Sequence, residues 1–178
     1  MDSGSFTLLS LCSGIGGLDL GVRIAVLRAR TVCYVEREAY CCEVLATRMD
    51  EGSLDSAPVW SDLTTFDGSR WRGLVDCIIA GFPCQPWSLA GKRKGLFDER
   101  WLWPALSRII REVQSGYVFL ENVPGLVRGG LDYILSDLAA LGFDAEWGML
   151  SASAVGAPHR RDRIFVLAQL AHTHISGL

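Results

Sequence analysis

The stretch FTLLSLCSGIGG, residues 6–17, indicates the fold class of this chain of 178 residues. Its first part, residues 6–12, is an apolar run of β-forming residues and predicts a strand. The glycine-rich residues 13–17 predict a tight turn, and the periodic apolar pattern over about 18–28 predicts a helix. A strand, a glycine turn and a helix in this order are typical of α/β folds that bind nucleotides.

The same alternation of strands and helices continues along the rest of the chain. Further strands are predicted over residues 31–35, 59–62, 75–80, 117–121, 144–151 and 163–169. Further helices are predicted over residues 38–48, 101–114 and 131–141. We therefore expect one α/β domain over residues 1–178 with a doubly wound, mostly parallel sheet; the last two strands lack a helix between them and indicate an antiparallel hairpin at one edge.

Composition excludes several classes of protein. The chain is 49% hydrophobic, has no apolar stretch of membrane-spanning length, and begins without the basic and apolar pattern of a signal peptide. Four of the six cysteines lie in or beside apolar segments, so we expect free thiols and a cytoplasmic protein. The close pair Cys41-Cys42 has no second pair at ligand spacing, so no metal site is expected.

Charge gives a local signal only. The formal net charge of −3 does not indicate nucleic-acid binding by the molecule as a whole. Two short basic clusters nevertheless lie on predicted loops, Lys92-Arg93-Lys94 and Arg160-Arg161-Asp162-Arg163. Each cluster alone is also compatible with an ordinary solvated face.

The glycine turn is followed by acidic residues at the ends of two predicted strands. Glycines let the backbone approach a ligand closely, although the same turn could serve only the packing of helix on sheet. Glu36 ends the second strand, where a carboxylate can accept hydrogen bonds from ribose hydroxyls, and Asp62 ends the third, where an adenine amino group would lie. Together they predict a nucleoside cofactor, and the short turn, which need not cradle a pyrophosphate, favours S-adenosylmethionine over a nicotinamide dinucleotide.

The stretch GFPCQPWS, residues 81–88, places a cysteine directly after a predicted buried strand. Ligands of open α/β sheets collect at the carboxyl ends of the strands, and Pro83 and Pro86 stiffen the turn, so Cys84 is predicted to be an exposed nucleophile. Glu121 ends the neighbouring strand, and Arg161 and Arg163 could favour the thiolate and orient that carboxylate. A buried structural cysteine and surface ion pairs are the plainer alternatives.

Four motifs in this order resemble the signature motifs of DNA (cytosine-5)-methyltransferases. They are LCSGIGG at residues 11–17, GFPCQPWS at residues 81–88 with GKRKG at 91–95, ENV at residues 121–123, and PHRRDR at residues 158–163. The resemblance runs from about residue 6 to residue 169. It implies the Rossmann-like fold of S-adenosylmethionine-dependent methyltransferases and an enzyme that methylates carbon 5 of cytosine in DNA, of restriction-modification or phage type.

The resemblance also implies roles for individual residues. Cys84 would add to carbon 6 of a cytosine flipped out of the duplex, Glu121 would hydrogen-bond ring N3 and the exocyclic amine, and Arg163, supported by Arg161, would orient this carboxylate. The implied S-adenosylmethionine site comprises Cys12, Ser13, Gly14, Ile15, Gly16, Gly17, Glu36, Arg37, Asp62, Leu63, Gly81 and Pro83. The implied loop and contacts toward the substrate comprise Gln85, Ser88, Lys92, Arg93, Lys94 and Asn122.

The chain also departs from the family pattern. Members continue past the last arginine motif into a target-recognition region and a final motif, so we expect this chain to be truncated, to be one half of a split enzyme completed by a second polypeptide, or to be an inactive remnant that binds nucleic acid or a partner. His159 stands where glutamine is common. A transfer RNA methyltransferase of the same family is a further alternative. A nicotinamide oxidoreductase would explain the glycine turn but not residues 83–85 and 121–123.

Overall fold

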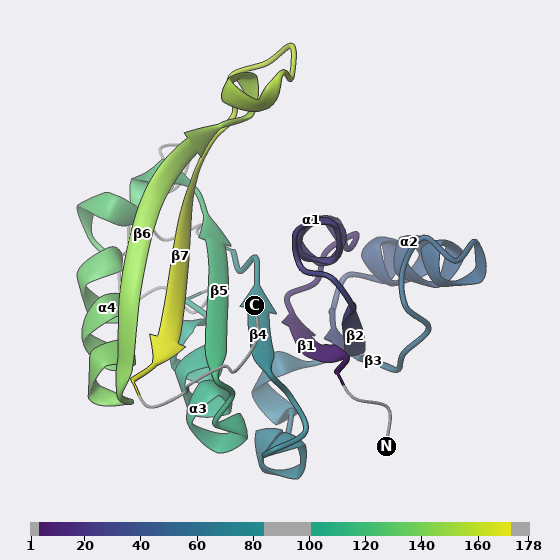
Figure 1. Ribbon diagram of the computed structural model, residues 1–178, viewed down its shortest axis with the longest axis horizontal. Coiled ribbons are helices and arrows are strands. Elements are labelled where there is room, and N and C mark those ends of the chain that lie inside the picture. The colour runs from purple at the N-terminus through teal and green to yellow at the C-terminus, as the bar shows by residue number, and fades with distance from the viewer. Residues whose placement is uncertain (1–3, 84–100, 172–178) are drawn as a thin grey trace.

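A computed structural model of the protein describes residues 4–83 and 101–171. Its centre is a seven-stranded sheet with the strand order β3-β2-β1-β4-β5-β7-β6 (Figure 1). The strands are β1 (Phe6–Leu11), β2 (Ala29–Val35), β3 (Val59–Trp60), β4 (Cys77–Ala80), β5 (Tyr117–Asn122), β6 (Phe143–Ser151) and β7 (Asp162–Leu170). The helices are α1 (Gly17–Ala25), α2 (Ala39–Asp50), α3 (Trp103–Val113) and α4 (Leu131–Ala140).

Strand directions confirm the mixed sheet expected from the sequence. β3, β2, β1, β4 and β5 pair in parallel, whereas β7 pairs antiparallel with both β5 and β6. The hairpin of β6 and β7 therefore forms one edge of the sheet, and its second strand lies inside, next to β5 (Figure 1). A helix is not needed between β6 and β7 because antiparallel neighbours can be joined by a short connection.

The two faces of the sheet are covered by different helices. Successive side chains of a strand point to opposite faces, so neighbouring residues of β4 enter different cores. Ile78 is buried with apolar residues of α3 and α4, including Ile109 and Ile134. Ile79 is buried on the other face, where Leu18 and Val22 of α1 pack. The doubly wound arrangement follows, with α1 and α2 on one side and α3 and α4 on the other (Figure 1).

Some elements are shorter than the sequence pattern predicts. The strand expected over residues 59–62 consists only of Val59–Trp60, because Asp62 accepts a hydrogen bond from the backbone of Thr64 and caps a short 3₁₀ helix, η1 (Leu63–Thr65). Similarly, α1 ends at Ala25 rather than near residue 28, since Val26 is already extended. No helix in the described ranges 4–83 and 101–171 is long and apolar enough to cross a membrane.

The chain reverses its direction of winding at β1. The strands β2 and β3 follow on one side of β1, and β4 and β5 lie on the other. In open α/β sheets such a switch point opens a crevice at the carboxyl ends of the two central strands, where ligands bind. The glycine turn after β1 and Gly81 after β4 both lie at this crevice.

Candidate functional site

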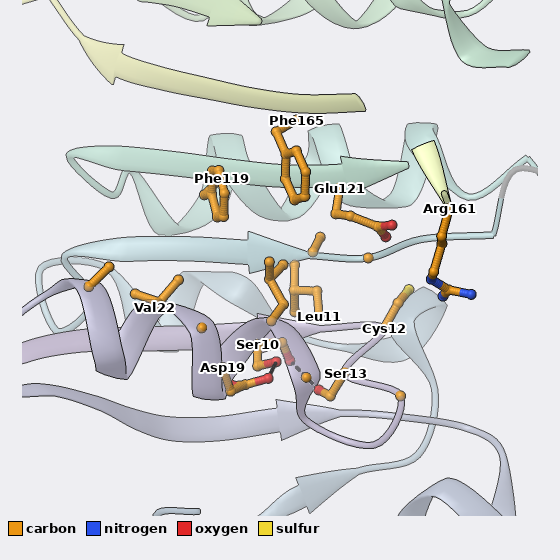
Figure 2. A pocket seen from close by; sticks show the side chains of 17 residues that line it. Ser10, Leu11, Cys12, Ser13, Asp19, Val22, Phe119, Glu121, Arg161 and Phe165 are labelled. Carbon is orange, nitrogen blue, oxygen red and sulfur yellow. Dashed lines mark hydrogen bonds between the residues drawn. The ribbon is translucent and has the colours of Figure 1, made fainter. Parts of the chain in front are cut away.

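A cavity of about 630 Å³ lies at the carboxyl ends of β1 and β4 (Figure 2). The glycine turn and α1 form one wall, and residues from the ends of β5 and β7 form the other. Figure 2 shows Cys12, Glu121 and Arg161 at the same end of this cavity. Seven residues that the sequence predicts for the site line it: Cys12, Ser13, Gly14, Gly17, Gly81, Glu121 and Arg161.

The glycine turn has a backbone that most residues would not adopt. Cys12, Gly14 and Gly16 have φ values of 51°, 53° and 79°, in the left-handed region that favours glycine. A Cβ atom at Gly14 would meet no atom within 4 Å, so this part of the turn leaves open space for a ligand. Arg48 of α2 supports the turn from outside, because its Nη1 donates to the carbonyl oxygen of Ile15 at 2.6 Å.

Replacement of Gly16 by alanine is expected to destabilise the fold more than replacement of Gly14. A Cβ at Gly16 would overlap Cδ1 of Leu54, whereas Gly14 has open space, and both positions share the unfavourable φ. We expect Gly16→Ala to lower the free energy of unfolding by about 3 kcal/mol, from backbone strain and overpacking, and Gly14→Ala by about 1 kcal/mol, from strain alone. Urea unfolding of both variants measures this difference, and equal losses would contradict it.

Glu36 fixes the turn to the end of β2. Its Oε2 accepts a hydrogen bond from the backbone N–H of Gly14 at 2.7 Å. Its Oε1 accepts hydrogen bonds from the N–H groups of Arg37 and Glu38 at 2.7 and 2.8 Å. A carboxylate offers about four acceptor positions, so this buried group retains capacity for a ligand hydroxyl.

Asp62 and Leu63 follow β3, which is separated by β2 from β1 and its glycine turn in the sheet order. Oδ1 of Asp62 accepts hydrogen bonds from the N–H and the hydroxyl of Thr64, both at 2.8 Å. These hydrogen bonds lower the pKa of the Asp62 carboxyl, and the charge of Arg37 lowers it further. Asp62 is therefore an oriented anion after the end of β3, as is required of a carboxylate that accepts a hydrogen bond from an amino group.

A carboxylate and a guanidinium pair at the opposite wall of the cavity. Oε1 of Glu121 lies 2.7 Å from Nε of Arg163, and both side chains are about one quarter exposed, at 28% and 23%. The pairing strands β5 and β7 bring the two together, although they are 42 positions apart in the chain (163 minus 121). Arg161 has a positive φ of 36° and lines the same cavity. Partly buried ion pairs of this kind hold the orientation of a carboxylate.

Asn122 contacts the end of β4. Its side-chain Nδ2 donates to the carbonyl oxygen of Phe82 at 3.1 Å, and its Oδ1 accepts from the N–H of Val123 at 2.8 Å. The side chain is buried, with 3% exposed. This amide therefore fixes the backbone two residues before Cys84. The predicted residues Cys84, Gln85, Ser88, Lys92, Arg93 and Lys94 lie outside the described ranges.

Asp19 belongs to the cavity wall but was not expected from the sequence. It is fully buried in the first turn of α1, where Oδ2 accepts from the Ser10 hydroxyl and Oδ1 from the Thr31 hydroxyl, each at 2.9 Å (Figure 2 shows the pair with Ser10). An acid on the inward stripe of an amphipathic helix is the one signal that could have revealed it. Burial raises the pKa of the Asp19 carboxyl, the two hydroxyls oppose this rise, and the charge of Asp55 adds to it.

The raised pKa of Asp19 predicts a pH-dependent contribution to stability. The Asp19 carboxyl binds its proton more tightly in the folded protein than in the unfolded chain, where the pKa of an aspartate is about 3.9. The protonated carboxyl therefore contributes stability below about pH 3.9, and this contribution is lost as the pH rises through the folded-state pKa. An amide at this position would remain neutral throughout. We expect the stability of Asp19→Asn, relative to the unchanged protein, to increase with pH in urea unfolding.

A matched variant controls this experiment. Asp132 also lies in the first turn of a helix, α4, but is exposed. Asp132→Asn should show no such increase with pH, because an exposed carboxylate remains solvated in both states. A stability difference for Asp19→Asn that is constant across the pH range would contradict the assignment.

The sheet order and the cavity at its switch point define a Rossmann-like fold of the S-adenosylmethionine-dependent methyltransferase class. The solved structure of the S. pombe Dnmt2 methyltransferase shares this fold with a TM-score of 0.75 at 23% identity, over 95% of this chain and 52% of that one. The family model "C-5 cytosine-specific DNA methylase" matches residues 6–176. The chain therefore belongs to the C-5 cytosine-specific DNA methylase family.

Two curated relatives support this membership. The type II methyltransferase M.NgoMIV of Neisseria gonorrhoeae is 32% identical over 92% of this chain and 51% of its own length. The type II methyltransferase M.CviJI of Paramecium bursaria Chlorella virus IL3A is 34% identical over 92% of this chain and 43% of its own length. The chain thus spans about half the length, or less, of these two relatives.

Proposed function

We propose that this chain carries the catalytic half of a DNA (cytosine-5)-methyltransferase of restriction-modification type, which transfers a methyl group from S-adenosylmethionine to carbon 5 of cytosine. Family membership and two type II methyltransferases among the relatives support the reaction class. The observation that carries the proposal is the Glu121–Arg163 ion pair, which faces the glycine turn across one cavity. It places an anchored carboxylate beside the strand end that leads to Cys84.

S-adenosylmethionine fits the residues at the carboxyl ends of β1, β2 and β3. Gly14 offers open space for close approach, Glu36 retains acceptor capacity for ribose hydroxyls, and Asp62 presents an oriented carboxylate toward an adenine amino group. When bound, the cofactor supplies an electrophilic methyl group. The residues of this chain hold it, and their geometry is already fixed by hydrogen bonds of the protein itself.

The chemistry at the base follows from the reactivity of cytosine. Carbon 5 is a poor nucleophile, so Cys84 as thiolate first forms a bond to carbon 6, and the electron pair of the ring moves toward carbon 5. Glu121, in its protonated form, donates its proton to ring N3 and accepts a hydrogen bond from the exocyclic amine, so the negative charge that develops on the ring as sulfur adds is neutralised. After carbon 5 takes the methyl group, its proton passes to solvent, the electron pair of that C–H bond re-forms the double bond between carbons 5 and 6, and Cys84 leaves as thiolate while N3 returns its proton to Glu121. Flipping the base out of the duplex costs a few kcal/mol.

The remaining residues of the site position these groups. Arg163 holds one oxygen of Glu121, which leaves the other free to face the base. Asn122 fixes the carbonyl of Phe82 just after β4. We also propose that Lys92, Arg93 and Lys94 contact phosphates of the DNA, since they follow Cys84 as a basic run.

A labelled-methyl transfer assay tests the proposal. Duplex DNA of mixed sequence and bulk transfer RNA are offered in competition to the chain alone and to the chain with the product of the adjacent reading frame. Label at carbon 5 of cytosine in DNA is the expected result, and label only with the second polypeptide would establish a split enzyme. Label only in transfer RNA, or cofactor binding without transfer in any mixture, would overturn it.

A further inference from the structure

The turn that carries Asp62 and Leu63 is held by Trp60, whose Nε1 donates to the carbonyl oxygen of Asp62 at 3.0 Å, and by one side chain of α3. Nη1 of Arg108 donates to the carbonyl oxygen of Phe66 at 2.9 Å. Its Nη2 donates to the carbonyl oxygens of Leu63 and Thr64 at 3.2 and 3.3 Å. One guanidinium thus binds three carbonyl groups within four residues of the chain (63 to 66).

Glu112 completes this arrangement one helical turn later. Nη1 of Arg108 lies 2.9 and 2.8 Å from its Oε1 and Oε2, so the carboxylate fixes the guanidinium. Oε2 of Glu112 also accepts from the N–H of Gly68 at 2.9 Å. A Cβ atom at Gly68 would lie 2.9 Å from that oxygen, so this close approach requires glycine. Arg108 and Glu112 are only about one third exposed, at 35% and 29%.

We infer that Arg108 is a positioning residue for recognition of the adenine ring, because it fixes the turn that orients Asp62. The inference rests on the proposed function, in which Asp62 meets the adenine amino group. Thr64 orients the carboxylate of Asp62 by donating two hydrogen bonds to it, and Arg108 fixes Thr64 by donating to its carbonyl oxygen. Arg108 itself touches neither the cofactor nor the base and acts through the turn alone.

The planar fork of arginine is essential to this role. Five N–H donors in fixed directions can serve three carbonyls and a carboxylate at once, whereas the single ammonium of lysine cannot span them. Charge-assisted hydrogen bonds are about twice as strong as neutral ones. Replacing Arg108 therefore removes strong hydrogen bonds from the turn. Replacement of Arg108 should therefore reduce the preference for a ligand that carries the adenine amino group, and not merely weaken binding of every ligand.

The experiment compares S-adenosylhomocysteine with S-inosylhomocysteine, in which a carbonyl oxygen replaces the adenine amino group. Calorimetry on the full chain gives the dissociation constant of each. The unchanged protein should prefer the adenosyl compound by roughly tenfold or more, as expected for a hydrogen bond to a charged group. Arg108→Met should bring this preference below about threefold. The variant Arg108→Lys keeps the positive charge beside Glu112 and should also lose the preference for the adenosyl compound. It serves in place of Arg108→Met if the methionine variant does not fold.

Arg111→Met is the matched control, since Arg111 is an exposed residue of the same helix and should leave the preference unchanged. Folded Arg108 variants that keep the full preference, or that weaken both ligands by the same factor, would overturn the positioning role. If the unchanged protein binds neither compound, the proposed cofactor is wrong and the inference falls with it. If the unchanged protein binds the two compounds equally well, Asp62 does not recognise the amino group. The inference about Arg108 is then wrong, but the proposed cofactor site is not contradicted.

Discussion

Cys84→Ser is expected to reduce methyl transfer by roughly 10³-fold or more. A serine hydroxyl remains protonated at neutral pH and is a much weaker nucleophile than a thiolate, so the bond to carbon 6 would not form at a useful rate. The dissociation constant for S-adenosylmethionine should change little, because the proposed cofactor contacts lie on the glycine turn and at the ends of β2 and β3. Initial rates with labelled cofactor and calorimetry measure the two effects.

The experiment should use whichever assembly proves active. Cys41→Ser is the matched control, since Cys41 is a partly exposed free thiol on α2, outside the cavity. Because the proton at carbon 5 must leave before Cys84 can be expelled, DNA with fluorine at that carbon should trap the unchanged protein as a covalent adduct, and Cys84→Ser should give none. Turnover by Cys84→Ser comparable to the unchanged enzyme would remove Cys84 from the mechanism.

Glu121→Gln is expected to lower kcat by roughly 10²-fold to 10³-fold, in the range for loss of one group that stabilises transition-state charge. The amide keeps the shape of the side chain but has no acidic proton to give to ring N3, and it replaces the charged partner of Arg163 at 2.7 Å by a neutral acceptor. Cofactor affinity should again change little. Steady-state kinetics under saturating cofactor give the effect on kcat, and calorimetry gives the affinity.

Glu146→Gln provides the comparison for Glu121. Glu146 is exposed on β6, the edge strand of the same sheet, so its replacement removes the same charge from the sheet without touching the cavity. Its kcat should equal that of the unchanged protein. Equal kcat values for Glu121→Gln and Glu146→Gln would show that the carboxylate at the end of β5 plays no part in the chemistry.

The sequence predicted the fold class because its signals are local. Alternating apolar runs and helical periodicity repeat over short windows, and the structure confirms the mostly parallel sheet with β6 and β7 as an antiparallel hairpin. Boundaries were less accurate where a side chain competed with the strand. At Asp62 the hydrogen bond from Thr64 ends β3 two residues early, a local effect that a period of two does not reveal.

The candidate site was predicted in part. The glycine turn, Gly81, Glu121 and Arg161 line one cavity, and Arg163 pairs with Glu121. The roles assigned to these residues, and to Cys84 outside the described ranges, remain predictions. Asp19 was missed although its position on the inward stripe of α1 could have revealed it. Arg108 was missed because nothing in its own segment distinguishes it from an ordinary surface arginine.

The sequence by itself determined the order of the elements, the residue types at the strand ends and the family resemblance, since each of these depends on residues close together in the chain. Only the tertiary structure decided which distant groups meet. The guanidinium of Arg108 reaches Leu63 across 45 positions, and Asn122 reaches Phe82 across 40. Such contacts depend on how strands pair and helices pack on the sheet, and no pattern within either segment encodes the other partner.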